Sequence, residues 1–250
     1  MESDQRVRDF KRILLCNDAP MTTCTAEESK QNYKSAMGEP LGALFYSLWQ
    51  EVAWVHLRWH EYVALYGDKP SRVALLNNSA PGFFRIVQDT LWEATLLHIA
   101  RLTDAPCSAG KSNLTIQRLH DEVRVRDANV AQRVKTLSDK AKVATEFCRD
   151  WRNRRIAHSD LSLALDENPT PLEAADRDKV NTALSAIVEV LNAVSLHYMN
   201  SSSFFDIHGY PGDVMSLLCI IDDGLRVEAE RRDRLKRREV GLDDYSNRNL

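Results

Sequence analysis

The sequence lacks the features that mark membrane, secreted and disulfide-rich proteins. No run of apolar residues approaches the roughly 20 residues that a helix needs to cross a bilayer, and residues 1–6 contain no apolar core of a signal peptide. The five cysteines are odd in number, lie far apart and never form a CxxC pair, which argues against a disulfide framework or a zinc site. We therefore expect a cytoplasmic protein with reduced thiols and no membrane partner.

Several enzyme signatures are also missing. The chain contains no GxGxxG, Walker loop, HExxH or GxSxG pattern. The seven histidines are scattered, and only His56 and His60 have the four-residue spacing of helical metal ligands. No third ligand accompanies them, and packing or exposure explains the pair better. The sequence predicts neither a metal site nor a cofactor.

Composition and charge place the chain among ordinary globular proteins. It has 250 residues, of which 44% are hydrophobic and 28% are charged, and its formal net charge is −3. These values exclude disordered and fibrous classes and argue against a general nucleic-acid coat, which would be strongly basic. A local basic patch remains compatible with them.

Helical periodicity dominates the sequence. Apolar residues recur every three or four positions over residues 41–66, 180–198 and 214–225. Residues 83–103 are apolar nearly all round, which is typical of the central helix of a bundle. Because no segment favours a strand and no repeat is present, we predict an all-α helical bundle of about five to seven helices.

The pattern divides the chain into three regions. Residues 1–40 form a polar lead-in with one short helix from Val7 to Leu15 and an irregular remainder, residues 41–225 form the helical domain, and residues 226–250 form a charged helix end and tail.

Local patterns predict several smaller features. Residues 72–76 form a short segment that leads into a turn at 77–82, and the alternation at 161–165 indicates a brief extended run. Thr170, Pro171 and Glu173 have the spacing of a capping box with proline at the first helical position, so we expect a helix to begin there.

Two charges interrupt the end of the apolar helix at 83–103. Arg101 and Asp104 are three residues apart, a spacing at which side chains on one helix face meet. We expect a structural ion pair between them.

The most unusual stretch is basic and lies at residues 149–160. A helical apolar stripe leads into it, and the same period continues to Arg155 and His158, where a core would need Leu or Ile. Burying such groups costs free energy unless they are paired, so we expect a site at this end of the helix. Its basic side chains are Arg149, Arg152, Arg154, Arg155 and His158.

Arginine and histidine together suit phosphodiester chemistry. A guanidinium presents a planar fork of donors to phosphate, and a histidine can exchange a proton with a ribose hydroxyl near neutral pH. Composition alone favours a simpler interpretation, a solvated helix end whose cations face the C-terminal dipole.

The segment from Arg152 to His158 resembles the signature of the HEPN superfamily, an arginine followed by a polar residue and, four to six residues after the arginine, a histidine. The surrounding chain resembles the abortive-infection branch of that superfamily, in matching order from about residue 41 to residue 225. The segments that carry this resemblance are Leu75-Leu76-Asn77, Phe83-Phe84, Ala100-Arg101-Leu102-Thr103-Asp104, Asn113-Leu114-Thr115 and Ile156-Ala157-His158-Ser159-Asp160-Leu161.

The resemblance implies a metal-independent endoribonuclease that acts as a toxin or phage-defence component. It implies that Arg152 binds the phosphate, that His158 transfers a proton, and that Asn153 orients one of them. Arg149, Arg154 and Arg155 would add charge for RNA. Implied partners are RNA, a second copy across a dimer cleft, and a cognate antitoxin. The alternative is a catalytically silent helical module that binds a nucleotide, RNA or a protein through the same patch.

Ideal helix geometry does not bring Arg152 and His158 together. Six residues turn through about 600°, which leaves the two side chains about 120° apart. Either the helix is distorted here, or Arg152 reaches round it, or the pair meets across a dimer.

Overall fold

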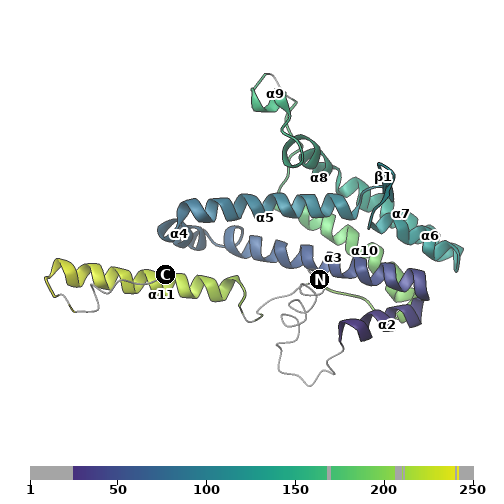
Figure 1. The fold of residues 1–250 in the computed structure, drawn as a ribbon, viewed down its shortest axis with the longest axis horizontal. Helices are drawn as coiled ribbons and strands as arrows, with labels where there is room; N and C mark the ends of the chain where they lie inside the picture. Colours follow the sequence, from purple (N-terminus) through teal and green to yellow (C-terminus); the bar gives the residue numbers. More distant parts are fainter. Residues whose placement is uncertain (1–24, 168–169, 206–209, 211, 240, 242–250) are drawn as a thin grey trace.

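The structure, a computed structural model, describes residues 25–167, 170–205, 210, 212–239 and 241 (Figure 1). Within these ranges the chain forms ten α-helices, and its strands are limited to one hairpin of two-residue strands. The predicted all-α class is confirmed. The short helix expected from Val7 to Leu15 lies outside the described residues.

Five long helices make up most of the fold. They are α3 (Glu39–Tyr66), α5 (Pro81–Leu102), α7 (Ala128–Ala144), α10 (Arg177–Met199) and α11 (Val214–Lys236). The short helices are α2 (Ala26–Met37), α4 (Pro70–Ser79), α6 (Leu119–Arg124), α8 (Glu146–Trp151) and α9 (Leu161–Ala164). A 3-10 helix, η1 (Ile116–Arg118), a π-helix, η2 (Arg152–Ile156), and the strands β1 (Cys107–Ser108) and β2 (Lys111–Ser112) complete the described elements.

Helix α3 runs through the middle of the bundle. Helices α2 and α5 pack along it, and α10 crosses it while packing along α7 (Figure 1). Leu41, Phe45 and Val52 of α3 are fully buried, as are Ile187 and Val190 of α10. The apolar stripes predicted for these helices are therefore their core faces.

The expectation that no segment approaches membrane-spanning length needs one correction, because helix α10 is the one described helix that is long and apolar enough to cross a membrane. Half of its most apolar window is buried inside the bundle, which is usual for the core helix of a soluble protein.

Helix α2 occupies part of the lead-in that we expected to be irregular. Thr25 and Glu28 form a capping box, in which the Glu28 N–H donates to Thr25 Oγ1 at 3.2 Å and the Thr25 N–H donates to the Glu28 side chain at 2.5 Å. Gly42 of α3 allows the backbone of α2 to approach α3 closely, because a Cβ at this position would lie 2.4 Å from the Tyr33 carbonyl oxygen. The helix was missed because it is mostly polar and buries only Met37.

Helix α4 replaces the short segment and the six-residue turn that we expected at 72–82. Pro70 lies in its first turn, and only Ala80 separates its end from α5, which begins at Pro81. Leu76 packs in a second apolar cluster with Phe84 and other side chains. This packing outweighs the turn preference of the Asn, Asn and Ser residues that precede Ala80.

The long helix expected before the basic stretch is interrupted at Thr145, between α7 and α8. The Thr145 hydroxyl lies 2.8 Å from the Thr103 hydroxyl and 2.9 Å from the Ala141 carbonyl oxygen. A threonine that bonds to its own preceding turn competes with regular helical bonding. The interruption sets the direction in which α8 and the basic stretch leave the bundle.

Candidate functional site

The helix widens into a π-turn at the arginine of the Arg152–His158 segment. The Ala157 N–H donates to the carbonyl oxygen of Arg152, five residues earlier, at 2.8 Å, and the Asp160 N–H donates to that of Arg154 at 3.0 Å. Of the three geometries considered for this segment, distortion of the helix is therefore present. Single π-turns of this kind are rare in proteins, and those that occur are often found at functional sites.

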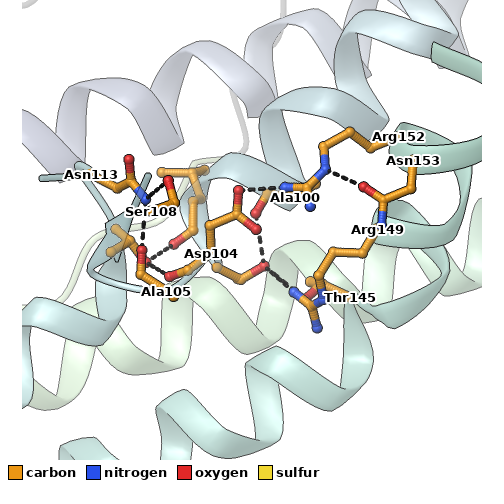
Figure 2. Close-up of polar contacts among 12 residues, drawn as sticks. Ala100, Asp104, Ala105, Ser108, Asn113, Thr145, Arg149, Arg152 and Asn153 are labelled. Atoms are coloured by element: carbon orange, nitrogen blue, oxygen red, sulfur yellow. Dashed lines mark hydrogen bonds and ion pairs between the residues drawn. The ribbon is translucent and has the colours of Figure 1, made fainter. Parts of the chain in front are cut away.

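Arg152 points toward the end of α5. Its Nη1 lies 2.5 Å from Asp104 Oδ2, and its Nε donates to Asn153 Oδ1 at 3.0 Å (Figure 2). The ion pair expected between Arg101 and Asp104 is wrong, because Asp104 pairs with Arg152, which lies 48 positions later in the chain. The Arg152 side chain is 24% exposed, so its fixed guanidinium remains accessible from solvent.

The loop that carries Asp104 is held by a network of hydrogen bonds. Thr115 Oγ1 donates to the Asp104 carbonyl oxygen at 2.8 Å. Asn113 Nδ2 donates to the Ala105 carbonyl oxygen at 2.8 Å (Figure 2). Arg118 Nε donates to the Asn113 carbonyl oxygen at 2.6 Å. The acceptor for Arg152 is therefore positioned by the fold before any ligand arrives.

Arg149 is committed to the protein scaffold. Its Nη1 donates to the hydroxyls of Thr103 at 3.1 Å and Thr145 at 3.3 Å, and its Nη2 donates to the carbonyl oxygen of Lys142. This side chain ties α8 to the ends of α5 and α7. The RNA contact that we expected from Arg149 stays a prediction, and it would have to be made by a guanidinium that already donates to these three oxygens.

Arg154 is also held by the protein. Its Nε donates to Asp160 Oδ2 at 3.3 Å, and its Nη1 donates to Asp150 Oδ1 at 3.5 Å. It also donates to two backbone carbonyl oxygens, from Nη1 to Pro171 at 3.3 Å and from Nη2 to Thr170 at 2.5 Å. Two carboxylates and two carbonyls thus accept from its guanidinium, and the phosphate contact expected from Arg154 stays a prediction.

These contacts explain why the capping box expected at Thr170 does not form. Arg154 donates to the carbonyl oxygens of Thr170 and Pro171, and Asp150 accepts from the Glu173 N–H at 2.8 Å. Helix α10 begins only at Arg177, with Asp176 as the N-cap. Long-range hydrogen bonds therefore override a local helix-start pattern.

The extended run expected at 161–165 is wrong as well, because α9 forms there. Asp160 caps it by accepting from the Leu163 N–H at 3.2 Å and from the Ser162 hydroxyl at 2.6 Å. The Ser162 bond, the Leu163 bond and Arg154 together hold the pKa of Asp160 below its ordinary value. Asp160 is thus an ionised structural cap.

Arg155 and His158 lie on the surface, whereas their periodicity placed them on the buried face. The π-turn and the bend after it carry both residues out of the bundle. The Arg155 side chain is 59% exposed and lies 3.6 Å from Glu93. The exposed His158 side chain has no hydrogen bond or ion pair to any other described residue.

A shallow cleft of about 340 Å³ adjoins this surface. Charged and polar side chains line one part of it and apolar side chains another. Its lining includes Glu93, Arg154, Arg155, Ser159, Asp160, Leu163 and Leu172.

Four polar residues at the site were not predicted from the sequence: Glu93, Thr103, Thr145 and Asp150. Thr103 and Asp150 lie beside residues that the sequence does indicate, but they bond to residues that are distant in sequence, Arg149 and Glu173. Glu93 lies on α5, far from the basic stretch in sequence, and no local pattern indicates its contact with Arg155.

Cys148 lies next to the basic stretch but does not suit nucleophilic chemistry. It is fully buried, and burial raises the pKa of its thiol to about 12, with a smaller opposing effect from Arg149. In the described part of the chain no group of three His, Cys, Asp or Glu side chains could hold a metal ion.

Comparison with models of known protein families matches residues 38–216, more than half of the chain, to the family HEPN_AbiU2, described as AbiU2. Comparison with curated proteins gives no match, and neither does comparison with solved structures. The matched region contains the whole site described above and ends in the first turn of α11.

Proposed function

The chain belongs to the AbiU2 family of HEPN-type abortive-infection proteins, and from that membership we propose that it is a metal-independent endoribonuclease of the HEPN type. We propose further that it acts in the cytoplasm as a toxin or phage-defence component, under the control of a cognate antitoxin.

The observation that carries this proposal is the arrangement around Arg152. Asp104 and Asn153 hold two of its nitrogens, and within the described residues its Nη2 has no protein acceptor. Such a guanidinium is oriented in advance and still has donors for a phosphate oxygen. His158, exposed on the chain that leaves the same π-turn, supplies the group for proton transfer.

These residues support cleavage by the ribose 2′-hydroxyl. His158 takes the proton of the 2′-hydroxyl, the 2′-oxygen bonds to the adjacent phosphorus, and the bond from phosphorus to the 5′-oxygen breaks. The leaving 5′-oxygen takes a proton from solvent, and the proton on His158 returns to solvent, so the products are a cyclic phosphate and a 5′-hydroxyl. Arg152 stabilises the charge on the non-bridging oxygens, a contribution of about 3 kcal/mol for one well-placed donor.

One motif supplies one arginine and one histidine, whereas the resembled sites use two motifs across a dimer cleft. We therefore propose a homodimer in which both His158 side chains lie near the two-fold axis, since closed two-fold dimers are the commonest homo-oligomers. RNA would bind along this cleft.

The second candidate is a catalytically silent module that binds a nucleotide, RNA or a protein. The inward-facing contacts of Arg149 and Arg154 favour it, because they leave only Arg152 and Arg155 of the four arginines for a ligand. A binding site needs fewer aligned groups than a nuclease.

Growth after induced expression separates the two candidates. If the protein is a ribonuclease toxin, the natural chain arrests growth and His158→Ala restores it. His197→Ala is the matched control, because His197 is a partly exposed histidine on α10 that lies outside the motif. Equal growth of the natural and His158→Ala strains, at equal protein levels, would support the binding module.

A further inference from the structure

Helix α11 is an appendage to the matched domain. The family match ends at residue 216, whereas α11 runs from Val214 to Lys236. The helix packs mainly against α4 and α3, and Figure 1 shows it in yellow, extending past α4 and away from the bundle. Most of its surface therefore faces solvent.

The helix carries two apolar stripes. The inner stripe, which includes Val214, Leu218 and Ile221, packs in the cluster with Phe84. The outer stripe consists of Leu217, Ile220, Gly224 and Val227, at the alternating spacings of three and four residues that characterise paired helices. All four are exposed, Ile220 to 68%. An apolar stripe that the described residues leave uncovered is a candidate interface.

The charges of α11 indicate what covers this stripe. Asp222 and Asp223 lie beside Gly224 and pair with Arg226 of their own chain, so Asp213 is the acidic residue at the start of α11. The far end of the helix is basic, with Arg231, Arg232, Arg234 and Lys236. A second α11 laid parallel would place the two basic ends together, whereas an antiparallel copy places Asp213 beside the basic end and also opposes the helix dipoles favourably.

Gly224 lies in the middle of the outer stripe. A glycine inside an exposed helix destabilises that helix relative to alanine. A Cβ at Gly224 would meet no atom within 4 Å, so the fold of one chain does not require the glycine. Its position suits the close approach of a second helix backbone.

We propose that α11 is a self-association arm, whose outer stripe pairs antiparallel with α11 of a second copy and crosses it near Gly224. In this register Ile220 packs against Val227 of the second copy, and Asp213 faces Arg234 of the second copy. The contact is two-fold symmetric and closes on itself. It does not depend on the proposed nuclease activity.

This contact is separate from a dimer through the Arg152–His158 segment. Helices α8 and α9 lie across the α3–α5 layer from α11 (Figure 1), so one contact does not form the other. If the segment also forms a two-fold dimer, the two contacts together produce an assembly larger than a dimer.

Light scattering on the purified full chain, over a range of micromolar concentrations, tests the arm. We expect the natural chain to self-associate, less tightly at high salt, and Ile220→Glu to halve its mass while its circular dichroism remains that of the folded helical chain. The matched control is Val143→Glu, on α7, because Val143 is 67% exposed and lies outside the arm. This variant should keep the natural mass.

Gly224→Ala adds a second test, because it should raise the stability of the isolated helix while weakening association. A natural chain that is monomeric at every concentration would overturn the proposal, as would an Ile220→Glu variant of unchanged mass. An Ile220→Glu variant that melts earlier without losing mass would show that the stripe is covered by its own chain, which also overturns it.

Discussion

Four arginines lie within a stretch of seven residues, yet their surroundings differ. Arg149 and Arg154 are surrounded by hydroxyl, carbonyl and carboxylate oxygens of the protein. Arg152 is held on one side and accessible on the other, and Arg155 lies on the surface beside Glu93. The positions of their partners, and not the charge of the stretch, distinguish a ligand for phosphate from a structural residue.

We expect Arg152→Lys to lower cleavage about 100-fold, the usual effect of removing one well-placed donor from a developing oxyanion. Lysine keeps the charge but loses the planar fork that Asp104 and Asn153 orient. Arg155→Lys is the control, and its loss should be much smaller, because Arg155 is exposed and makes only a 3.6 Å ion pair. Single-turnover cleavage of one RNA by both variants measures the difference, and an equal loss would contradict the assignment of Arg152.

Arg154→Lys should act on stability instead. A lysine cannot replace contacts to Asp150, Asp160 and two carbonyls, and hydrogen bonds of charged groups contribute about 2 kcal/mol each. Urea unfolding should therefore show a lower free energy of unfolding, while the folded fraction keeps its activity. Unchanged stability with lost cleavage would instead make Arg154 a direct ligand of the substrate.

At the scale of the elements, local patterns predicted the long helices and long-range contacts decided the site. The stripes of α3, α10 and α11 repeat along the sequence itself, and α5 is apolar along its length, so local patterns were sufficient to find these helices. The failed capping box at Thr170 depends on Arg154, and the partner of Asp104 is Arg152, 48 positions away. No local pattern contains such pairs, which is why the motif could be located from the sequence but its π-turn and its internal contacts could not.

The contact between α3 and α5 includes a buried histidine. His98 of α5 is 7% exposed, with its Nε2 2.8 Å from Glu51 Oε2 and its Nδ1 3.3 Å from Arg58 Nη1. Burial lowers the pKa of His98, and the positive charges of Arg58 and Arg101 act in the same direction, while Glu51 opposes them. The folded protein therefore keeps His98 neutral at a pH where an ordinary histidine is protonated.

This shift predicts how stability depends on pH. Below about 6.5, the ordinary pKa of histidine, the unfolded chain binds a proton that folded His98 does not, so the free energy of unfolding decreases as the pH is lowered through this range. The pKa of Glu51, lowered mainly by its hydrogen bond with His98, adds a similar loss only at more acidic pH. His98→Gln should flatten the dependence near neutral pH in urea titrations. A natural chain that gains stability as the pH falls through this range would contradict the buried neutral state.

At the scale of the whole molecule, the proposed function requires two copies, because each chain offers one Arg152 and one His158. The matched domain contains the motif, and α11 extends beyond that domain on the other side of the bundle. The Arg152–His158 dimer would complete the site, and the α11 contact would join such sites into a larger assembly. Neither contact replaces the other.

Cleavage of a defined RNA by the purified natural chain tests the account most directly. If His158 activates the ribose 2′-hydroxyl, cleavage proceeds in EDTA, leaves a cyclic phosphate and a 5′-hydroxyl, and is abolished by His158→Ala but not by His197→Ala. A single 2′-deoxy substitution at the cut site should also prevent it. Cleavage that a chelator stops, or that continues at the 2′-deoxy position, would contradict the proposed mechanism.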